Sequence, residues 1–170
     1  LISRPVKVLA GDISTPTGIA FNSKGEMVVT EWEANLVSIR DRQGKKLLDL
    51  RGHTCEHPFG VALDSEDSVY VSEEDANKIS KFSRSGVFVK SVGARGTEPG
   101  HFRSPRGLRI INGKLYICDW ENNRVQVFDR DLQFLECIVG KEKSFKWATD
   151  LAASSEGLLY IAGTEISDVQ

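Results

Sequence analysis

Short apolar runs alternate with polar turn residues along the whole chain. In the clearest copy, apolar runs at 108–111, 115–118 and 125–128 are separated by the polar segments 112–113 and 119–123. The runs are rich in β-branched, aromatic and aliphatic residues, whereas the segments between them contain Asn, Asp and Gly, which favour turns. No segment keeps the 3.6-residue apolar period of an amphipathic helix. The pattern therefore predicts short strands joined by tight turns.

The same pattern occurs three more times, so the chain is built from repeats. Pro16, Pro58, Pro105 and Ala148 begin equivalent runs. A period of about 40 to 50 residues that holds four strand-length runs is typical of propeller blades. We therefore expect an all-β fold, a β-propeller of four-stranded antiparallel blades, of which the chain supplies about 3.5 to 4. The expected blades are 12–52, 53–95 and 96–140, with 1–11 as the outer strand of a preceding blade and 141–170 as an incomplete blade.

The residues of these repeats resemble NHL repeats. Each copy has Pro-x-Gly or its equivalent, a strand that ends in an acidic or small residue, and a turn that leads into the next strand. The likeness is strongest at 105–128, where Asp119, Asn123 and Arg124 match the family's Asp-x-x-x-Asn-Arg turn, and it extends to the Gly-rich linker at 93–105. The resemblance implies a propeller that usually has six blades and about 260 residues. We therefore expect the chain to be a fragment of a larger propeller.

The charge of the chain is close to balanced. A formal net charge of −2 gives no general field that would attract nucleic acid or an anionic membrane, so binding of either would need a local patch. The sequence contains no apolar run long enough to span a membrane. We expect no membrane partner.

The three cysteines do not suggest a metal site or a disulfide framework. Cys55, Cys118 and Cys137 are an odd, widely spaced set without a Cys-x-x-Cys motif. Cys118 ends a predicted inner strand and Cys137 lies in an apolar outer strand, so we interpret both as buried reduced thiols. Reduced thiols favour a cytoplasmic location.

Two sets of residues recur once per blade, and we interpret both as structural. The glycines are Gly18, Gly60 and Gly107, and the acids are Glu31, Glu73 and Asp119. Glycine lets the inner strand approach the crowded propeller axis, although the fourth copy has Asp150 instead. A carboxylate suits a turn because it accepts hydrogen bonds from nearby backbone N–H groups. Catalytic groups seldom repeat with the period of a blade, so we expect neither set to be catalytic.

One end of the predicted blades is the candidate binding surface. It combines the turns 31–35, 73–77 and 119–123, which carry only acidic charges, with the crossovers between blades. The long crossover 94–104 adds basic and aromatic residues, and aromatic and Arg side chains on exposed loops are typical of binding hot spots for protein or single-stranded RNA. The candidate partner-binding residues are Arg95, His101, Arg103, Trp120, Arg124, Lys143, Lys146 and Trp32. Phe102 and Trp147 have an alternative place as inward contacts between blades, which we favour for Phe102.

Catalysis has little support in the sequence. His53, His57 and His101 are too scattered to predict a ligand set from spacing, and Arg109 is the one charged residue that we place on the axis-lining strands. We therefore expect no catalytic residue, no metal and no cofactor in this segment.

Three functions fit these observations to different degrees. The resemblance implies a non-enzymatic, protein-binding propeller, the substrate-recognition part of a tripartite-motif ubiquitin ligase whose RING domain lies elsewhere. Binding of single-stranded RNA by the same face is the alternative, but the acidic turns oppose it because phosphate contacts need Lys and Arg. A propeller lyase or hydrolase is the second alternative. Open blade edges also allow self-association.

Overall fold

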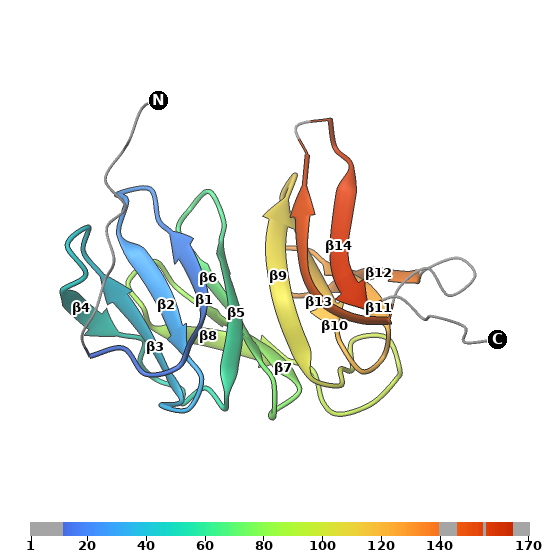
Figure 1. Cartoon of the computed structure of the whole chain (residues 1–170), viewed down its shortest axis with the longest axis horizontal. Helices are drawn as coiled ribbons and strands as arrows, with labels where there is room; N and C mark the ends of the chain where they lie inside the picture. Colours follow the sequence, from blue (N-terminus) through green and yellow to red (C-terminus); the bar gives the residue numbers. More distant parts are fainter. Residues whose placement is uncertain (1–11, 140–145, 155, 165–170) are drawn as a thin grey trace.

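The structure, a computed structural model, describes residues 12–139, 146–154 and 156–164. Its strands form three four-stranded antiparallel sheets and one two-stranded sheet (Figure 1). The first sheet contains β1 (Pro16–Phe21), β2 (Met27–Glu31), β3 (Leu36–Arg40) and β4 (Lys46–Asp49). The second contains β5 (Pro58–Leu63), β6 (Val69–Glu73), β7 (Lys78–Phe82) and β8 (Phe88–Val92). The third contains β9 (Pro105–Ile111), β10 (Lys114–Asp119), β11 (Arg124–Phe128) and β12 (Phe134–Val139), and the fourth contains β13 (Lys146–Ala153) and β14 (Leu159–Thr164).

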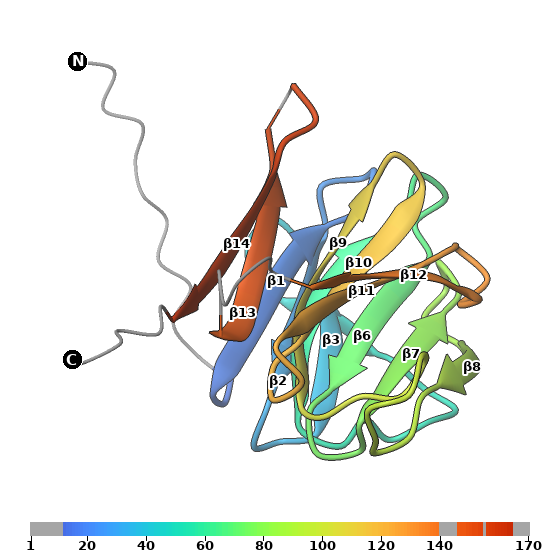
Figure 2. The same cartoon turned by 90° about the vertical axis from the view of Figure 1, so that its right-hand side faces the viewer.

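The sheets lie side by side as the blades of a propeller (Figures 1 and 2). Strands within each sheet follow one another in sequence order, and the first strands are neighbours, because β5 packs against β1 and β9, and β9 packs against β13. The predicted fold class, a partial all-β propeller, is therefore confirmed. We number the blades one to four in chain order. The predicted outer strand at 1–11 lies outside the described residues, as do 141–145 and 165–170 of the fourth blade.

Apolar clusters fill the boundaries between neighbouring blades. Examples are Val28 and Val61 between blades one and two, Tyr70 and Leu108 between two and three, and Cys118 and Leu151 between three and four. Phe102 is fully buried and stacks on Phe128, with ring centroids 5.8 Å apart. The inward position expected for Phe102 is therefore confirmed. Burial between blades means that each blade depends on its neighbour for stability.

The recurring glycines face the backbone of the next blade. A Cβ atom at Gly18 would lie 2.7 Å from the carbonyl oxygen of Phe59, and one at Gly60 would lie 2.5 Å from that of Arg106. Gly107 faces the backbone of blade four in the same way. These distances are too short for a carbon atom, so the absence of a side chain sets how closely the inner strands pack.

The recurring acids tie each turn to the crossover that enters the same blade. Each of the three is buried and accepts a hydrogen bond from a crossover N–H. The pairs are Glu31 with Ser14 (3.0 Å), Glu73 with Glu56 (2.9 Å) and Asp119 with Arg103 (2.8 Å). The predicted structural role of these acids agrees with these bonds.

The asparagines of the same turns reach one blade further. Each has a positive φ, and its Oδ1 accepts a hydrogen bond from the N–H of the next crossover. The pairs are Asn35 with His57 (2.7 Å), Asn77 with Ser104 (3.0 Å) and Asn123 with Trp147 (2.9 Å). Acid and asparagine together fix where every turn lies relative to both neighbouring crossovers, and so hold the turns of successive blades in register.

The thiols differ in exposure. Cys55 and Cys118 are buried, whereas Cys137 is exposed, so the prediction that Cys137 is buried was wrong. Cys137 lies on β12, the outermost strand of blade three, whereas β13 packs on β9, β10 and β11. Burial raises the pKa of the Cys118 thiol to about 12 and also raises that of Cys55.

The part of the chain that the structure describes contains no helix with the length and apolar character of a membrane span.

Candidate interaction face

The turns and crossovers lie at one end of the blades. We define the interaction face as the turns 31–35, 73–77 and 119–123 together with the described crossover residues 52–57 and 93–104, at the lower end in Figure 1. Antiparallel order places all of them at this end, because each first strand begins here and each second strand ends here. The three turns therefore lie on one surface, as the sequence predicted.

A row of side chains runs across the interaction face from blade to blade. We call it the cross-blade ladder, and its members are His57, Trp32, Glu74, Arg106, Trp120 and Trp147. The Trp32 ring stacks on His57 at a centroid distance of 4.0 Å, and its Nε1–H donates to Glu74 (2.9 Å). The Nε–H of Arg106 in turn donates to Glu74 at 2.8 Å. The ladder thus links blades one, two and three through polar and aromatic contacts.

The ladder continues from Arg106 into blade four. The Arg106 guanidinium carbon lies 3.7 Å from the centre of the Trp120 ring, and the rings of Trp120 and Trp147 are 5.9 Å apart. A guanidinium over an indole is stabilised by about 0.5–2 kcal/mol, depending on its solvation. Trp147 is 48% exposed, so it does not tuck inward, although it contacts Trp120 of the neighbouring blade as the alternative expected. The rings are held in place before any partner arrives, which lowers the entropic cost of binding.

An acidic hollow lies beside the ladder, between blades two and three. Its volume is about 410 Å³. Its lining residues are Glu74, Asp75, Asn77, Arg95, Ser104 and Glu121. Glu74 is already paired with Arg106, so Asp75 and Glu121 against the Arg95 guanidinium leave the hollow weakly acidic, which favours a cationic group. The hollow and the ladder share Glu74, so a partner that fills one also reaches the other.

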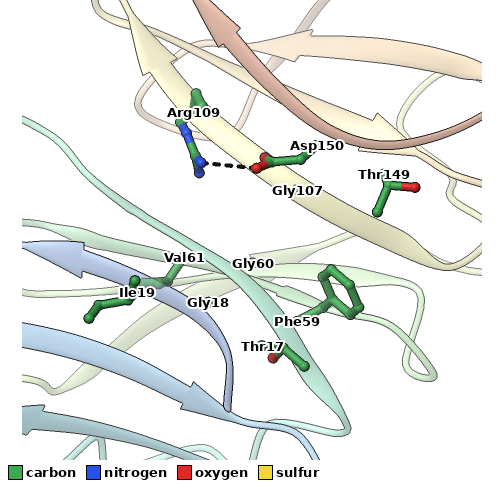
Figure 3. A pocket seen from close by; sticks show the side chains of 10 residues that line it. All are labelled: Thr17, Gly18, Ile19, Phe59, Gly60, Val61, Gly107, Arg109, Thr149 and Asp150. Atoms are coloured by element: carbon green, nitrogen blue, oxygen red, sulfur yellow. Dashed lines mark hydrogen bonds and ion pairs between the residues drawn. The ribbon is translucent and has the colours of Figure 1, made fainter. Parts of the chain in front are cut away.

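A second hollow, the axial cavity, lies where the inner strands meet (Figure 3). Its volume is about 390 Å³, and Arg109 and Asp150 form an ion pair there with Nη2 and Oδ2 3.1 Å apart. Arg109 lies at the axis as the sequence predicted, whereas its partner Asp150 was not expected to add a charge there. Among the described lining residues there is no His, no Cys and no second carboxylate. The arrangement supplies one neutralised charge pair and no acid–base couple.

The segment at the centre of this face matches a known repeat. A sequence model of the NHL repeat matches residues 102–128, which run from the long crossover through β9, β10 and β11. The fold is that of a β-propeller, and residues 102–128 of it match the NHL repeat. No curated protein matches it significantly in sequence.

Solved propellers share the fold of this chain at low sequence identity. Virginiamycin B lyase from Staphylococcus aureus is 20% identical, with a TM-score of 0.71 over 87% of this chain and 48% of that chain. A streptogramin B lyase is 22% identical, with a TM-score of 0.72 over 91% of this chain and 50% of the lyase. A chain of the nidogen/laminin complex is 15% identical, with a TM-score of 0.70 over 89% of this chain and 58% of that chain. This chain thus spans about half the length of the lyases, and the likeness shows the fold alone.

The structure brings some of the predicted binding residues together. Trp32 and Trp120 belong to the ladder, and Arg95 lines the acidic hollow. Arg103 is exposed on the crossover 93–104. His101 is half-buried on that crossover. Their role in binding stays a prediction.

Arg124 is held within the fold. Its Nε–H donates to Asp119 at 2.7 Å, and its other N–H groups donate to the carbonyl oxygens of Thr97, Glu98 and His101. The side chain therefore anchors the long crossover, which leaves little of it for a partner. Lys146 is half-buried at the start of β13, and Lys143 lies outside the described residues.

Sequence reasoning placed Glu74 on the binding surface as part of the acidic turn 73–77, but it did not predict the contacts among Glu74, Arg106 and His57 that build the ladder. Glu74 occupies the same repeat position as Trp32 and Trp120, one residue after the turn acid. An alignment of the repeats could therefore have placed Glu74 beside these two side chains. Arg106 is the middle residue of a Pro-x-Gly motif, and we interpreted this motif only for its effect on the backbone. The contact of Arg106 with both Glu74 and Trp120 depends on how two blades are placed, which no local pattern reveals.

Proposed function

We propose that this NHL-repeat propeller is a non-enzymatic, protein-binding module that holds its partner on the interaction face. We further propose that it serves in the cytoplasm as the substrate-recognition part of a tripartite-motif-type ubiquitin ligase. The observation that supports binding is the cross-blade ladder with the acidic hollow beside it. The ligase assignment rests on the resemblance of the repeats to the NHL domains of those ligases.

The ladder has the composition of an interface hot spot. Trp and Arg are enriched among residues whose truncation costs more than about 2 kcal/mol of binding energy. Trp120 and Trp147 offer aromatic surface, and Arg106, itself bonded to Glu74, lies over the Trp120 ring. A side chain that is fixed in the free protein loses little further freedom on binding. A flat apolar or aromatic group of a partner fits on these rings.

The acidic hollow indicates the charge of the partner. Exposed Asp75 and Glu121 flank the same face, so a partner with Lys or Arg next to an apolar residue complements it. Such complementarity acts mainly on the association rate and on specificity. The same carboxylates repel phosphate, and both Arg106 and Arg124 are already paired with acids. These contacts favour protein over RNA.

The test compares what variants of the chain capture from cytosolic lysate. Trp120→Ala combined with Arg103→Ala removes an aromatic and a cationic contact from the face. The matched control is Arg84→Ala, an exposed residue in the turn between β7 and β8, at the opposite ends of the strands. We expect the double variant to lose at least one protein that the wild type and the control both capture, in lysate treated with ribonuclease.

Two outcomes would overturn the proposal. If the double variant keeps every partner while circular dichroism shows that all three proteins are folded, the binding face lies elsewhere. If ribonuclease removes all captured proteins, the face binds RNA and the protein contacts are indirect.

A further inference from the structure

The turn acids of the first three blades are each paired with a cationic or ionisable side chain, but the partner differs. In blade one Glu31 lies 3.3 Å from Arg40, and in blade three Asp119 lies 2.7 Å from Arg124. Arginine is always charged in proteins, so both buried carboxylates have a permanent counter-charge. In blade two the partner of Glu73 is His53, with Nε2 and Oε1 2.8 Å apart. Imidazole is positively charged only when it is protonated, so blade two lacks the permanent counter-charge.

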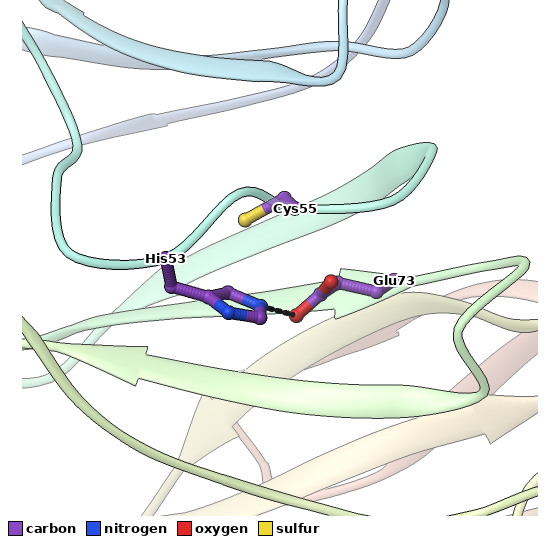
Figure 4. A group of neighbouring side chains, drawn as sticks. All are labelled: His53, Cys55 and Glu73. Carbon is purple, nitrogen blue, oxygen red and sulfur yellow. Dashed lines mark hydrogen bonds and ion pairs between the residues drawn. The ribbon is translucent and has the colours of Figure 1, made fainter.

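A thiol completes the group in blade two. His53, Cys55 and Glu73 gather where the crossover between blades one and two passes the end of β6 (Figure 4). One ligand atom from each of them lies within 4.8 Å of the other two. Glu73 and Cys55 are buried, whereas His53 is half-buried and leaves one side open to solvent. The spacing of these residues in the sequence did not predict this cluster, because Glu73 comes from a different strand.

We propose that His53, Cys55 and Glu73 form a Zn²⁺ site. Imidazole nitrogen, thiolate sulfur and carboxylate oxygen are the three kinds of ligand that Zn²⁺ uses in proteins, and a soft thiolate disfavours Mg²⁺ and Ca²⁺. Ligand atoms at about 2.0–2.3 Å from a tetrahedral zinc lie roughly 3.3–3.8 Å from one another. The His53–Glu73 separation of 2.8 Å is shorter than this, and the ligand atoms of all three residues lie within 4.8 Å of one another, so side-chain rotations can bring them to one ion. Three protein ligands leave the fourth position of a tetrahedral zinc for water or for a group of a partner.

The charges balance when Zn²⁺ binds. The Cys55 thiol releases its proton to solvent, and the resulting thiolate and the Glu73 carboxylate together neutralise the two positive charges of the ion. His53 binds as the neutral imidazole and gives up its hydrogen bond to Glu73. The other Glu73 bonds, from the Glu56 N–H and the Ser80 hydroxyl, hold the carboxylate in place. Such outer hydrogen bonds orient the ligands of a metal site.

The experiment titrates the 170-residue chain, freed of metal by a chelator, with Zn²⁺ by calorimetry and with Co²⁺ by absorption spectroscopy. A Cys137→Ser background removes the exposed thiol as a competing ligand. We expect one Zn²⁺ per chain and a near-ultraviolet thiolate-to-cobalt band. Cys55→Ser should abolish the band and weaken Zn²⁺ binding by more than the about 10–100-fold that loss of an outer hydrogen-bond partner causes. Cys118→Ser, the matched buried control, should change neither.

Two results would reject the zinc site. Absence of one-to-one binding in the Cys137→Ser chain rejects it, and so does binding that Cys55→Ser leaves unchanged. If Cys55→Ser does not fold, the Cys118→Ser/Cys137→Ser chain decides, because Cys55 is then the only thiol. A thiolate-to-cobalt band in that chain supports the site, and no band rejects it.

Discussion

The guanidinium of Arg106 lies 3.7 Å from the centre of the Trp120 ring and 2.7 Å from the carboxylate of Glu74. One side chain thus joins an aromatic ring of its own blade to an acid of the neighbouring blade. The Arg106 side chain is only 22% exposed, so both contacts are partly shielded from water. Removal of Arg106 should therefore affect the stability of the blade boundary as well as the shape of the interaction face.

Arg106→Gln should lower the free energy of unfolding by about 1–3 kcal/mol, because Glu74 is left buried without its charge partner. Urea unfolding followed by tryptophan fluorescence measures the change. Arg84→Gln, in the exposed β7–β8 turn, is the control and should stay within about 0.5 kcal/mol of wild type. Equal stabilities of the two variants would contradict the role given to Arg106.

Gly60→Ala should destabilise the propeller by about 1–3 kcal/mol, since the new Cβ would be 2.5 Å from the Arg106 carbonyl oxygen and blades two and three must move apart. Gly113→Ala is the comparison, because a Cβ there meets nothing within 4 Å. Its positive φ of 75° costs an alanine about 1–2 kcal/mol. Thermal unfolding measures the loss of stability in both variants. A smaller loss for Gly60→Ala than for Gly113→Ala would show that the blades tolerate a wider gap.

Asp67 should make the stability of the folded chain depend on pH in the acidic range. Hydrogen bonds from the Ser23 hydroxyl (2.6 Å) and N–H (2.7 Å) join blades one and two and lower the pKa of Asp67. A lowered pKa means that the contribution is complete above the ordinary aspartate pKa of about 4 and disappears as the pH falls through the folded value.

Asp67→Asn should therefore cost about 1 kcal/mol at pH 7, after allowance for solvent screening, and progressively less at lower pH. Chemical unfolding at several pH values measures this difference. A difference between wild type and Asp67→Asn that does not shrink in acid would contradict the assignment.

Cys137 should be the thiol that reacts in the folded protein. It is exposed, whereas Cys55 and Cys118 are buried, and burial raises the pKa of Cys118 to about 12. The thiolate is the reactive form, so the buried thiols stay inert near pH 8. Alkylation with iodoacetamide and mass spectrometry should modify Cys137 first and the other two only in denaturant. Equal labelling of all three in native buffer would show that the blades open readily.

The sequence predicted the strands, turns and repeats, which local residue patterns determine. Alternating apolar runs and Asn or Asp at the turns identified the strands, because side-chain period and turn chemistry act within a few residues. Asp119 and its counterparts were recognised as structural since they recur in each blade. The repeat period then supplied the propeller, whose neighbouring blades bury the apolar faces.

What the sequence did not predict depends on contacts between residues far apart in the chain. Arg106 meets Glu74 only because two blades pack side by side, and His53 meets Glu73 only because the crossover entering blade two passes the end of β6. Arg124 looked available for a partner, yet it caps carbonyl groups of its own crossover. Exposure of Cys137 likewise follows from its place on the outermost strand of blade three. An apolar run alone does not distinguish such a strand from an inner one.

Site-specific photo-crosslinking can show whether a protein partner binds on the interaction face. A photoreactive amino acid replaces Arg103 on the face in one chain and Arg84 at the opposite end in another, and both are irradiated in cytosolic lysate. We expect a discrete protein adduct from position 103 that resists ribonuclease and disappears when Trp120→Ala is added, with no such adduct from position 84. The same adduct from both positions, or an adduct at 103 that consists of RNA, would contradict binding of a protein partner on this face.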